Sequence, residues 1–216
     1  MSFTRSRVRL SVRFRARIVT AAATLALGGA AVFLGGEAAV AVKGRVAAVL
    51  IESAWRARLR DGRPHRPWPW ADFTPVARLA VPRLGIDRPV LSDASGRTLA
   101  FGLGQVTGTA RPGGPGLAAI AGHRNTWGEF LRDLRDGDDV VLTGPGGART
   151  YTVVERRVVT RPASGMLSGS DVGGGDAVVL ITCWPFDGLR PGPLRYLVIG
   201  RPRPAKGGGG QGPAQF

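Results

Sequence analysis

The chain has 216 residues, 44% of them hydrophobic, and a formal net charge of +15, so it can form one domain with additional segments. A single cysteine excludes an internal disulfide, and one cysteine with two histidines excludes a cysteine-rich structural zinc site, which needs about four such ligands. The charge does not indicate a nucleic-acid-binding domain, because residues 71–200 carry fourteen basic and twelve acidic side chains and most of the excess lies outside them.

The amino-terminal segment has the pattern of a membrane anchor. Residues 1–17 contain six arginines and no acidic residue, and the uncharged stretch 18–36 is long enough to cross a bilayer as a helix. The positive-inside rule predicts that residues 1–17 are cytoplasmic and that the rest of the chain lies outside that membrane. The alternative is a cleaved signal peptide, with "AVA" at 39–41 as its cleavage site.

Residues 37–61 predict an amphipathic helix that extends the anchor as a stalk. Val42, Val46, Val49 and Leu50 have the i, i+4, i+7, i+8 spacing of one helix face. We therefore expect these four side chains to form the apolar face of the stalk.

Residues 62–74 interrupt the helical pattern with prolines at 64, 67 and 69 and predict a Pro/Trp-rich linker. His65 lies in this linker, and we expect it to be structural or solvated rather than catalytic. Trp68 and Trp70 are expected to pack against the domain that follows.

Residues 75–201 predict a β-rich domain. Strand patterns bounded by turn residues occur in "VARLAVPRLGI", "GLAAIAGH", "AVVLITC" and "PLRYLVIG", and "DVVLTGPGGARTYTVVERRVVT" predicts a hairpin with a loop from Gly144 to Ala148. Several short strands of this kind favour a sandwich or a closed barrel. A short helix is expected after His123, because Thr126 and Glu129 have capping-box spacing. Residues 202–216 are of low complexity and are expected to be disordered.

Three side chains at predicted strand ends form a candidate catalytic group. His123 follows the strand in "IAGH", Cys183 ends the strand "AVVLITC", and Arg195 lies in the next strand. A cysteine is a good nucleophile as thiolate, which a nearby histidine or arginine favours. Imidazole can protonate a leaving amine, and a fixed cation can stabilise an oxyanion. The group suits acyl transfer from an amide; the alternatives are a buried structural cysteine and a solvated surface arginine.

The segments around these residues resemble the catalytic segments of the sortases. The resemblance lies in the "TC" of "LITCWPF", the "GH" of "AGHRNT" and the arginine of "GPLRYLV". The segments "PWPWADFTPVARLAVPRLGI" and "CWPFDGLRPGPLRYLV" are most similar to the class GN sortases of Gram-negative proteobacteria. The resemblance implies an all-β fold, a closed eight-stranded β-barrel with one or two short helices, preceded by the transmembrane helix and the stalk.

The same resemblance implies the roles of the site residues. Cys183 would be the nucleophile, His123 the general acid and base, and Arg195 the group that holds the substrate carbonyl and the oxyanion. Thr182, Asn125 and Trp184 would contact the substrate.

The resemblance also implies the reaction and its partners. A sortase cleaves an LPxTG-like C-terminal sorting signal of an exported protein, forms a thioacyl-enzyme and transfers the acyl group to an amine, which here is unknown, without a metal or another cofactor. The expected location is the bacterial inner membrane, with a periplasmic domain and no nucleic-acid partner. Two alternatives stay open: an L,D-transpeptidase acting on peptidoglycan stems, and a non-catalytic membrane-tethered β domain with a buried cysteine.

Overall fold

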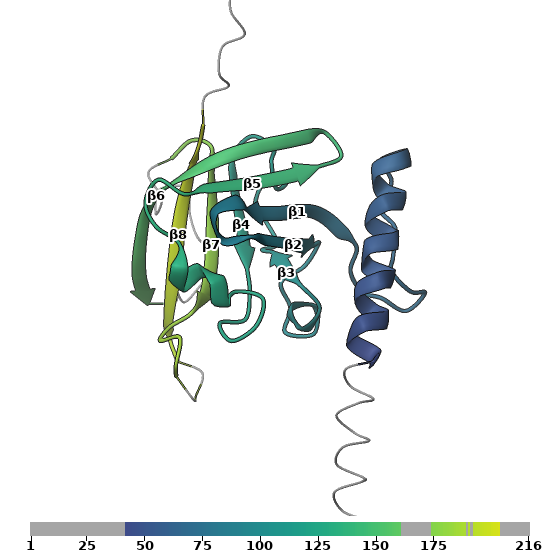
Figure 1. Ribbon diagram of the computed structural model, residues 1–216, viewed down its shortest axis with the longest axis horizontal. Coiled ribbons are helices and arrows are strands. Elements are labelled where there is room, and N and C mark those ends of the chain that lie inside the picture. Colours follow the sequence, from purple (N-terminus) through teal and green to yellow (C-terminus); the bar gives the residue numbers. More distant parts are fainter. Residues whose placement is uncertain (1–41, 161–173, 189, 191, 204–216) are drawn as a thin grey trace, which may run out of the picture. The chain divides into compact units, whose positions relative to one another are not determined.

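The computed structural model describes residues 42–160, 174–188, 190 and 192–203. Eight strands close into a barrel in the order β1-β2-β3-β4-β7-β8-β6-β5 (Figure 1), which confirms the predicted closed eight-stranded architecture. The strands are β1 (Pro75–Val81), β2 (Ile86–Leu91), β3 (Leu103–Gln105), β4 (Leu117–Ala121), β5 (Asp139–Gly144), β6 (Gly147–Thr160), β7 (Ala177–Cys183) and β8 (Leu194–Pro202).

Most neighbouring strands run antiparallel, but β2–β3 and β4–β7 are parallel pairs. In β1 the buried residues alternate with half-buried ones, as expected for a strand with one face toward the core. In β7 both faces are covered: Val178 and Leu180 belong to the interior cluster, and Val179 belongs to a second cluster with Leu197 and Ile199 of β8. Each fully buried side chain of this size contributes about 1.5–3 kcal/mol of hydrophobic stabilisation, so β7 is a rigid support for the residue at its end.

Three 3-10 helices lie in the described part of the barrel, where the sequence predicts one or two short helices. They are η1 (Pro82–Leu84), η2 (Thr98–Ala100) and η3 (Glu129–Asp133). The capping box predicted after His123 is wrong, because η3 is capped by Gly128 and has no side-chain cap hydrogen bond. Phe130 and Leu131 of η3 instead anchor this segment by packing into the interior cluster.

A helix over residues 42–61 precedes the barrel. The chain divides into two units, Met1–Val46 and Ala47–Phe216, so only residues 47–61 of this helix belong with the barrel. Their buried face is Ala47, Ile51, Ala54 and Trp55, and Ile51 packs with Phe73 and Leu91. Val42, Val46, Val49 and Leu50, the predicted apolar face of the stalk, lie one position away from this buried face and are exposed by 37–68%.

The two tryptophans of the linker lie in different environments. The ring of Trp68 packs edge-on against the rings of Phe73 and Phe101, with centroid distances of 5.5 and 5.3 Å, as expected. Trp70 is 78% exposed, so its predicted packing against the domain is wrong.

No helix among the described residues is long and apolar enough to cross a membrane. The anchor predicted at 18–36 and residues 204–216 of the predicted tail lie outside the described part of the chain.

Candidate active site

The register of three neighbouring strands brings the predicted catalytic residues to one place. In the parallel pair β4–β7, Ala121 is opposite Ile181, so His123 and Cys183 each lie two residues beyond this pair. In the antiparallel pair β7–β8, Cys183 is directly opposite Arg195. Neighbouring strands are about 4.8 Å apart, so the imidazole, the thiol and the guanidinium start from adjacent backbone positions.

Cys183 and Arg195 point away from the barrel interior. Side chains alternate along a strand, and Cys183 therefore shares the face of Val179 and Ile181 rather than that of the interior residues Val178 and Leu180. Directly opposite residues in an antiparallel pair have Cβ atoms about 4.5–5.5 Å apart. Cys183 and Arg195 thus start side by side on the outer face, and both residues are half-buried.

The backbone around His123 is held by close contacts, while the residue itself is exposed. Gly122 N donates to Ile181 O at 3.0 Å, and Gly128 N donates to His123 O at 2.8 Å. A Cβ at Gly122 would lie 2.7 Å from a methyl carbon of Leu103 and 3.0 Å from Gly128. The turn after β4 therefore requires glycine at both positions, and it fixes where the imidazole leaves the chain.

Thr182 faces the inside of the barrel and is 2% exposed. Its Oγ1 donates to Gly122 O at 2.8 Å, so the residue before the cysteine is bonded to the residue before the histidine. The structure gives this hydroxyl a role in joining β4 to β7. The predicted contact of Thr182 with substrate stays a prediction.

The Arg195 guanidinium is bonded on one side only. Its Nη1 donates to Gly192 O at 2.7 Å and to Leu194 O at 2.8 Å. Among the described residues, Nε and Nη2 form no hydrogen bond. Because Arg195 lies directly opposite Cys183, these donors are available to an oxyanion that forms during attack of the thiol on a carbonyl.

An aromatic cluster begins the loop between β7 and β8. Trp184 stacks on Tyr196 with ring centroids 5.6 Å apart, and Phe186 meets both rings edge-on. Asn125 is exposed in the turn after His123. The predicted contacts of Trp184 and Asn125 with substrate stay predictions.

Arg124 is a site residue that the sequence prediction missed. Its guanidinium donates to Pro185 O at 3.1 Å, to Gly188 O, and to Arg190 O at 3.2 Å. One side chain next to the histidine thus ties down the loop that connects the cysteine strand to the arginine strand. The position of Arg124 beside His123 is the only sequence signal for this role, because its partners are backbone carbonyls.

The arrangement supplies a nucleophile, a proton carrier and an oxyanion donor within one surface site. Among the described residues, no group of three or more His, Cys, Asp or Glu side chains is placed to hold a metal ion. The chemistry that these three groups can perform by themselves is acyl transfer through a thioester.

Comparison with known proteins identifies relatives of the barrel. The family model of the sortase domain matches residues 79–203. Sortase D of Bacillus subtilis (strain 168) is 24% identical over 123 residues, which are 57% of this chain and 61% of that protein, so the chain spans less than two thirds of its relative.

Solved structures show the same fold. Sortase C-1 from Actinomyces oris is 25% identical, with a TM-score of 0.52 over 73% of this chain and 99% of that one. Sortase A from Corynebacterium diphtheriae is 24% identical, with a TM-score of 0.53 over 62% of this chain and 63% of that one.

Proposed function

The chain belongs to the sortase family, whose members are cysteine transpeptidases acting on sorting signals, and we propose that it is a membrane-anchored sortase that cleaves an LPxTG-like C-terminal signal of an exported protein. The observation that carries the proposal is the strand register. It pairs Cys183 with Arg195, and it places His123 and Cys183 each two residues beyond the pair Ala121–Ile181.

The first half of the proposed reaction forms a thioacyl-enzyme. The Cys183 thiolate attacks the carbonyl carbon of the scissile peptide bond, and the carbonyl oxygen becomes an oxyanion. The free N–H groups of Arg195 donate to that oxygen. His123, protonated, gives its proton to the leaving amide nitrogen, the C–N bond breaks, and the carboxy-terminal fragment departs as an amine.

The second half reverses these roles with a new amine. Neutral His123 takes a proton from the incoming amine as its nitrogen attacks the thioester carbon. Arg195 again stabilises the oxyanion, the C–S bond breaks, and Cys183 leaves as thiolate. Water in place of the amine gives hydrolysis.

A direct test is covalent capture with full-length protein. Peptides with LPxTG-like motifs, varied at each position, are incubated with and without triglycine, and the protein is analysed by intact mass spectrometry. We expect a mass increase equal to the acyl fragment, which Cys183→Ala lacks, and a ligated product when triglycine is present. Turnover by folded Cys183→Ala at a tenth of the parent rate would contradict covalent catalysis by this residue. An absence of adduct and product with every peptide would contradict the proposed substrate class.

The membrane location is a separate part of the proposal. Its support is the six-arginine flank before the uncharged stretch 18–36. We expect the protein to fractionate with the inner membrane and residues 71–201 to be digested when protease is added to spheroplasts. Full protection in intact spheroplasts would place the domain in the cytoplasm and contradict the proposed orientation.

We also propose class GN membership, supported by the similarity of residues 67–86 and 183–198 to that class. A neighbouring gene that encodes a protein ending in an LPxTG-like motif, an apolar span and a few arginines would support a dedicated substrate.

A further inference from the structure

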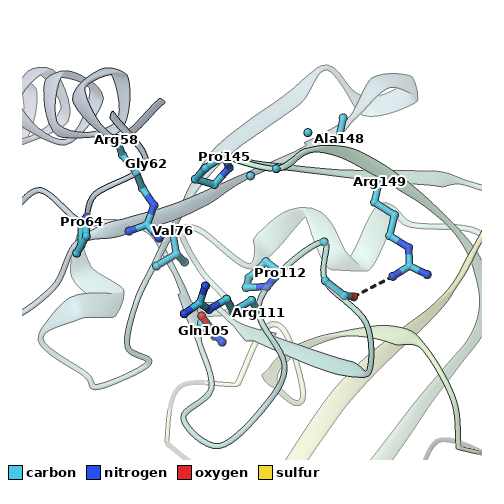
Figure 2. A pocket seen from close by; sticks show the side chains of 15 residues that line it. Arg58, Gly62, Pro64, Val76, Gln105, Arg111, Pro112, Pro145, Ala148 and Arg149 are labelled. Atoms are coloured by element: carbon cyan, nitrogen blue, oxygen red, sulfur yellow. Dashed lines mark hydrogen bonds between the residues drawn. The ribbon is translucent and has the colours of Figure 1, made fainter. Parts of the chain in front are cut away.

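Fifteen residues line a cavity of about 720 Å³, which Figure 2 shows from close by. It lies at the end of the barrel away from the catalytic residues. Its wall includes Arg111 in the loop before β4 and residues 144–149 of the β5–β6 hairpin. β4 starts at Leu117, just after this loop, and ends two residues before His123. A strand of five residues spans about 16 Å, so the cavity is separate from the active site.

Two arginines that have no acidic partner among the described residues converge on this cavity. Arg58 continues the buried face of the helix, at i+11 from Ala47 and i+4 from Ala54. Figure 2 shows its side chain extending from the helix toward Gln105 and Arg111. Its Nε is buried and has no hydrogen-bond partner among the described residues. The fifteen lining residues include no Asp or Glu.

The two positive charges act on one another. Burial lowers the pKa of the Arg58 guanidinium, and the nearby charge of Arg111 lowers it further. The charge of a third arginine of the wall, Arg149, is compensated by Asp176, whose Oδ2 accepts a hydrogen bond from it at 2.6 Å. Arg149 also donates to Gly114 O at 2.9 Å. The uncompensated charge of the cavity therefore comes from Arg58 and Arg111.

A purely structural explanation accounts for only part of this arrangement. Arg58 lies in the last turn of the helix, where Gly62 N donates to Arg58 O, and the carbonyl end of a helix favours a cation. That effect is well under one charge, and it does not supply the missing partner of the buried Nε. Arg111 is exposed and solvated, but solvation of Arg111 does not explain why both guanidinium groups face a cavity without an acid.

We propose that this cavity binds a phosphate group, held between Arg58 and Arg111. Guanidinium forks donate in pairs to phosphate or carboxylate. A carboxylate has two oxygens in one plane, and one fork can occupy both. A tetrahedral phosphate offers oxygens in several directions, which suits two forks that come from different segments. Six of the fifteen lining residues are glycine, so few side chains fill the space and the rest of a phosphate ester can enter.

Binding of radiolabelled inorganic phosphate to the full chain in maltoside micelles tests the proposal, with ionic strength held constant by chloride. We expect saturable binding that weakens by about tenfold or more in Arg58→Gln and in Arg111→Gln, because each variant loses charge-assisted hydrogen bonds to the phosphate oxygens. The matched control is Arg60→Gln, which removes the same charge from the same helix two residues away, at a position that does not line the cavity. It should keep parent affinity.

Competition then identifies the source of the phosphate. Displacement by micelles doped with phosphatidic acid, but not by glycerol phosphate, would indicate a lipid headgroup; displacement by glycerol phosphate would indicate a soluble ester. Absence of saturable phosphate binding would overturn the proposal, and so would equal weakening by Arg60→Gln, which would show a general charge effect. Arg111 lies on an exposed loop, so its variant keeps the test valid if Arg58→Gln does not fold. Peptide cleavage is not the readout, so the outcome is independent of the proposed sortase reaction.

Discussion

Removal of the Arg124 guanidinium should release the loop between β7 and β8. This side chain holds three loop carbonyls, those of Pro185, Gly188 and Arg190. The structure leaves little room beside it, since a Cβ at Gly188 would lie 2.9 Å from Arg124 Nη1. We therefore predict that Arg124→Met lets the loop open without unfolding the barrel.

The size of the effect follows from the three bonds. A hydrogen bond to a charged group contributes about 1.5–3 kcal/mol when it is shielded from solvent. Two of the three bonds are exposed, so we assign about 1 kcal/mol to each of the three. The total of about 3 kcal/mol corresponds to a change of roughly 150-fold in the ratio of closed to open loop. If the closed loop is needed for catalysis, kcat/KM should fall by about 10- to 100-fold, because affinity and turnover scale with the competent fraction.

Two measurements separate this role from a general effect on folding. Hydrogen exchange of the amides of Trp184, Phe186, Asp187 and Gly188 should speed up in Arg124→Met, while the melting temperature changes little. Arg124→Lys should lie between the parent and the Met variant, because an ammonium is a point charge that cannot serve three carbonyls at once. The control is Arg97→Met, which breaks only a surface pair with Asp72 at 82% and 65% side-chain exposure. Parent-like kcat/KM and parent-like exchange in Arg124→Met would refute the reasoning.

Three further predictions concern the barrel and the site. Arg195→Lys should lower kcat by about 10²–10³-fold, as loss of an oxyanion donor does, whereas Arg190→Lys in the loop before β8 should stay within about threefold of the parent in kcat/KM assays. Thr182→Val should lower the free energy of unfolding by about 1–3 kcal/mol, because it leaves a buried carbonyl without its donor; urea denaturation measures this. Asp138→Asn should destabilise the protein at pH 7, because Arg83 holds the pKa of the Asp138 carboxyl below its usual value. That stability is present above the unfolded pKa of about 3.9 and is lost as the pH falls through the lower folded pKa, so the parent and the Asn variant should converge in acid.

Each of these predictions has an outcome that contradicts it. Equal and small effects at 190 and 195 would mean that Arg195 is an ordinary surface residue. An unchanged urea midpoint for Thr182→Val would show that its hydrogen bond adds nothing to stability. A stability difference at Asp138 that persists at the lowest pH would mean that it does not arise from the ionised carboxylate.

Elements whose signal is local could be predicted from the sequence alone. The run "AVVLITC" predicts a strand because it is short, apolar and β-branched, and the structure places β7 there. The same holds for the β5–β6 hairpin, although its turn is shorter than predicted, since Gly144 already pairs with Gly147. The placement of His123, Cys183 and Arg195 at strand ends was also predictable, because His123 follows one recognisable strand pattern, Cys183 ends a second and Arg195 lies near the start of a third.

Which surfaces pack together depends on the tertiary fold. The helix over residues 42–61 has two apolar stripes one position apart, and only the barrel selects the one with Ile51 and Trp55. Trp70 has the same local pattern as Trp68 but no partner ring among the described residues. Arg124 donates hydrogen bonds to carbonyls that are 61 to 66 residues away in the sequence. The cavity is lined by residues from a helix, a loop and a hairpin. Backbone carbonyls and distant glycines carry no side-chain pattern, so these contacts are set by strand register and packing, which a local sequence signal does not contain.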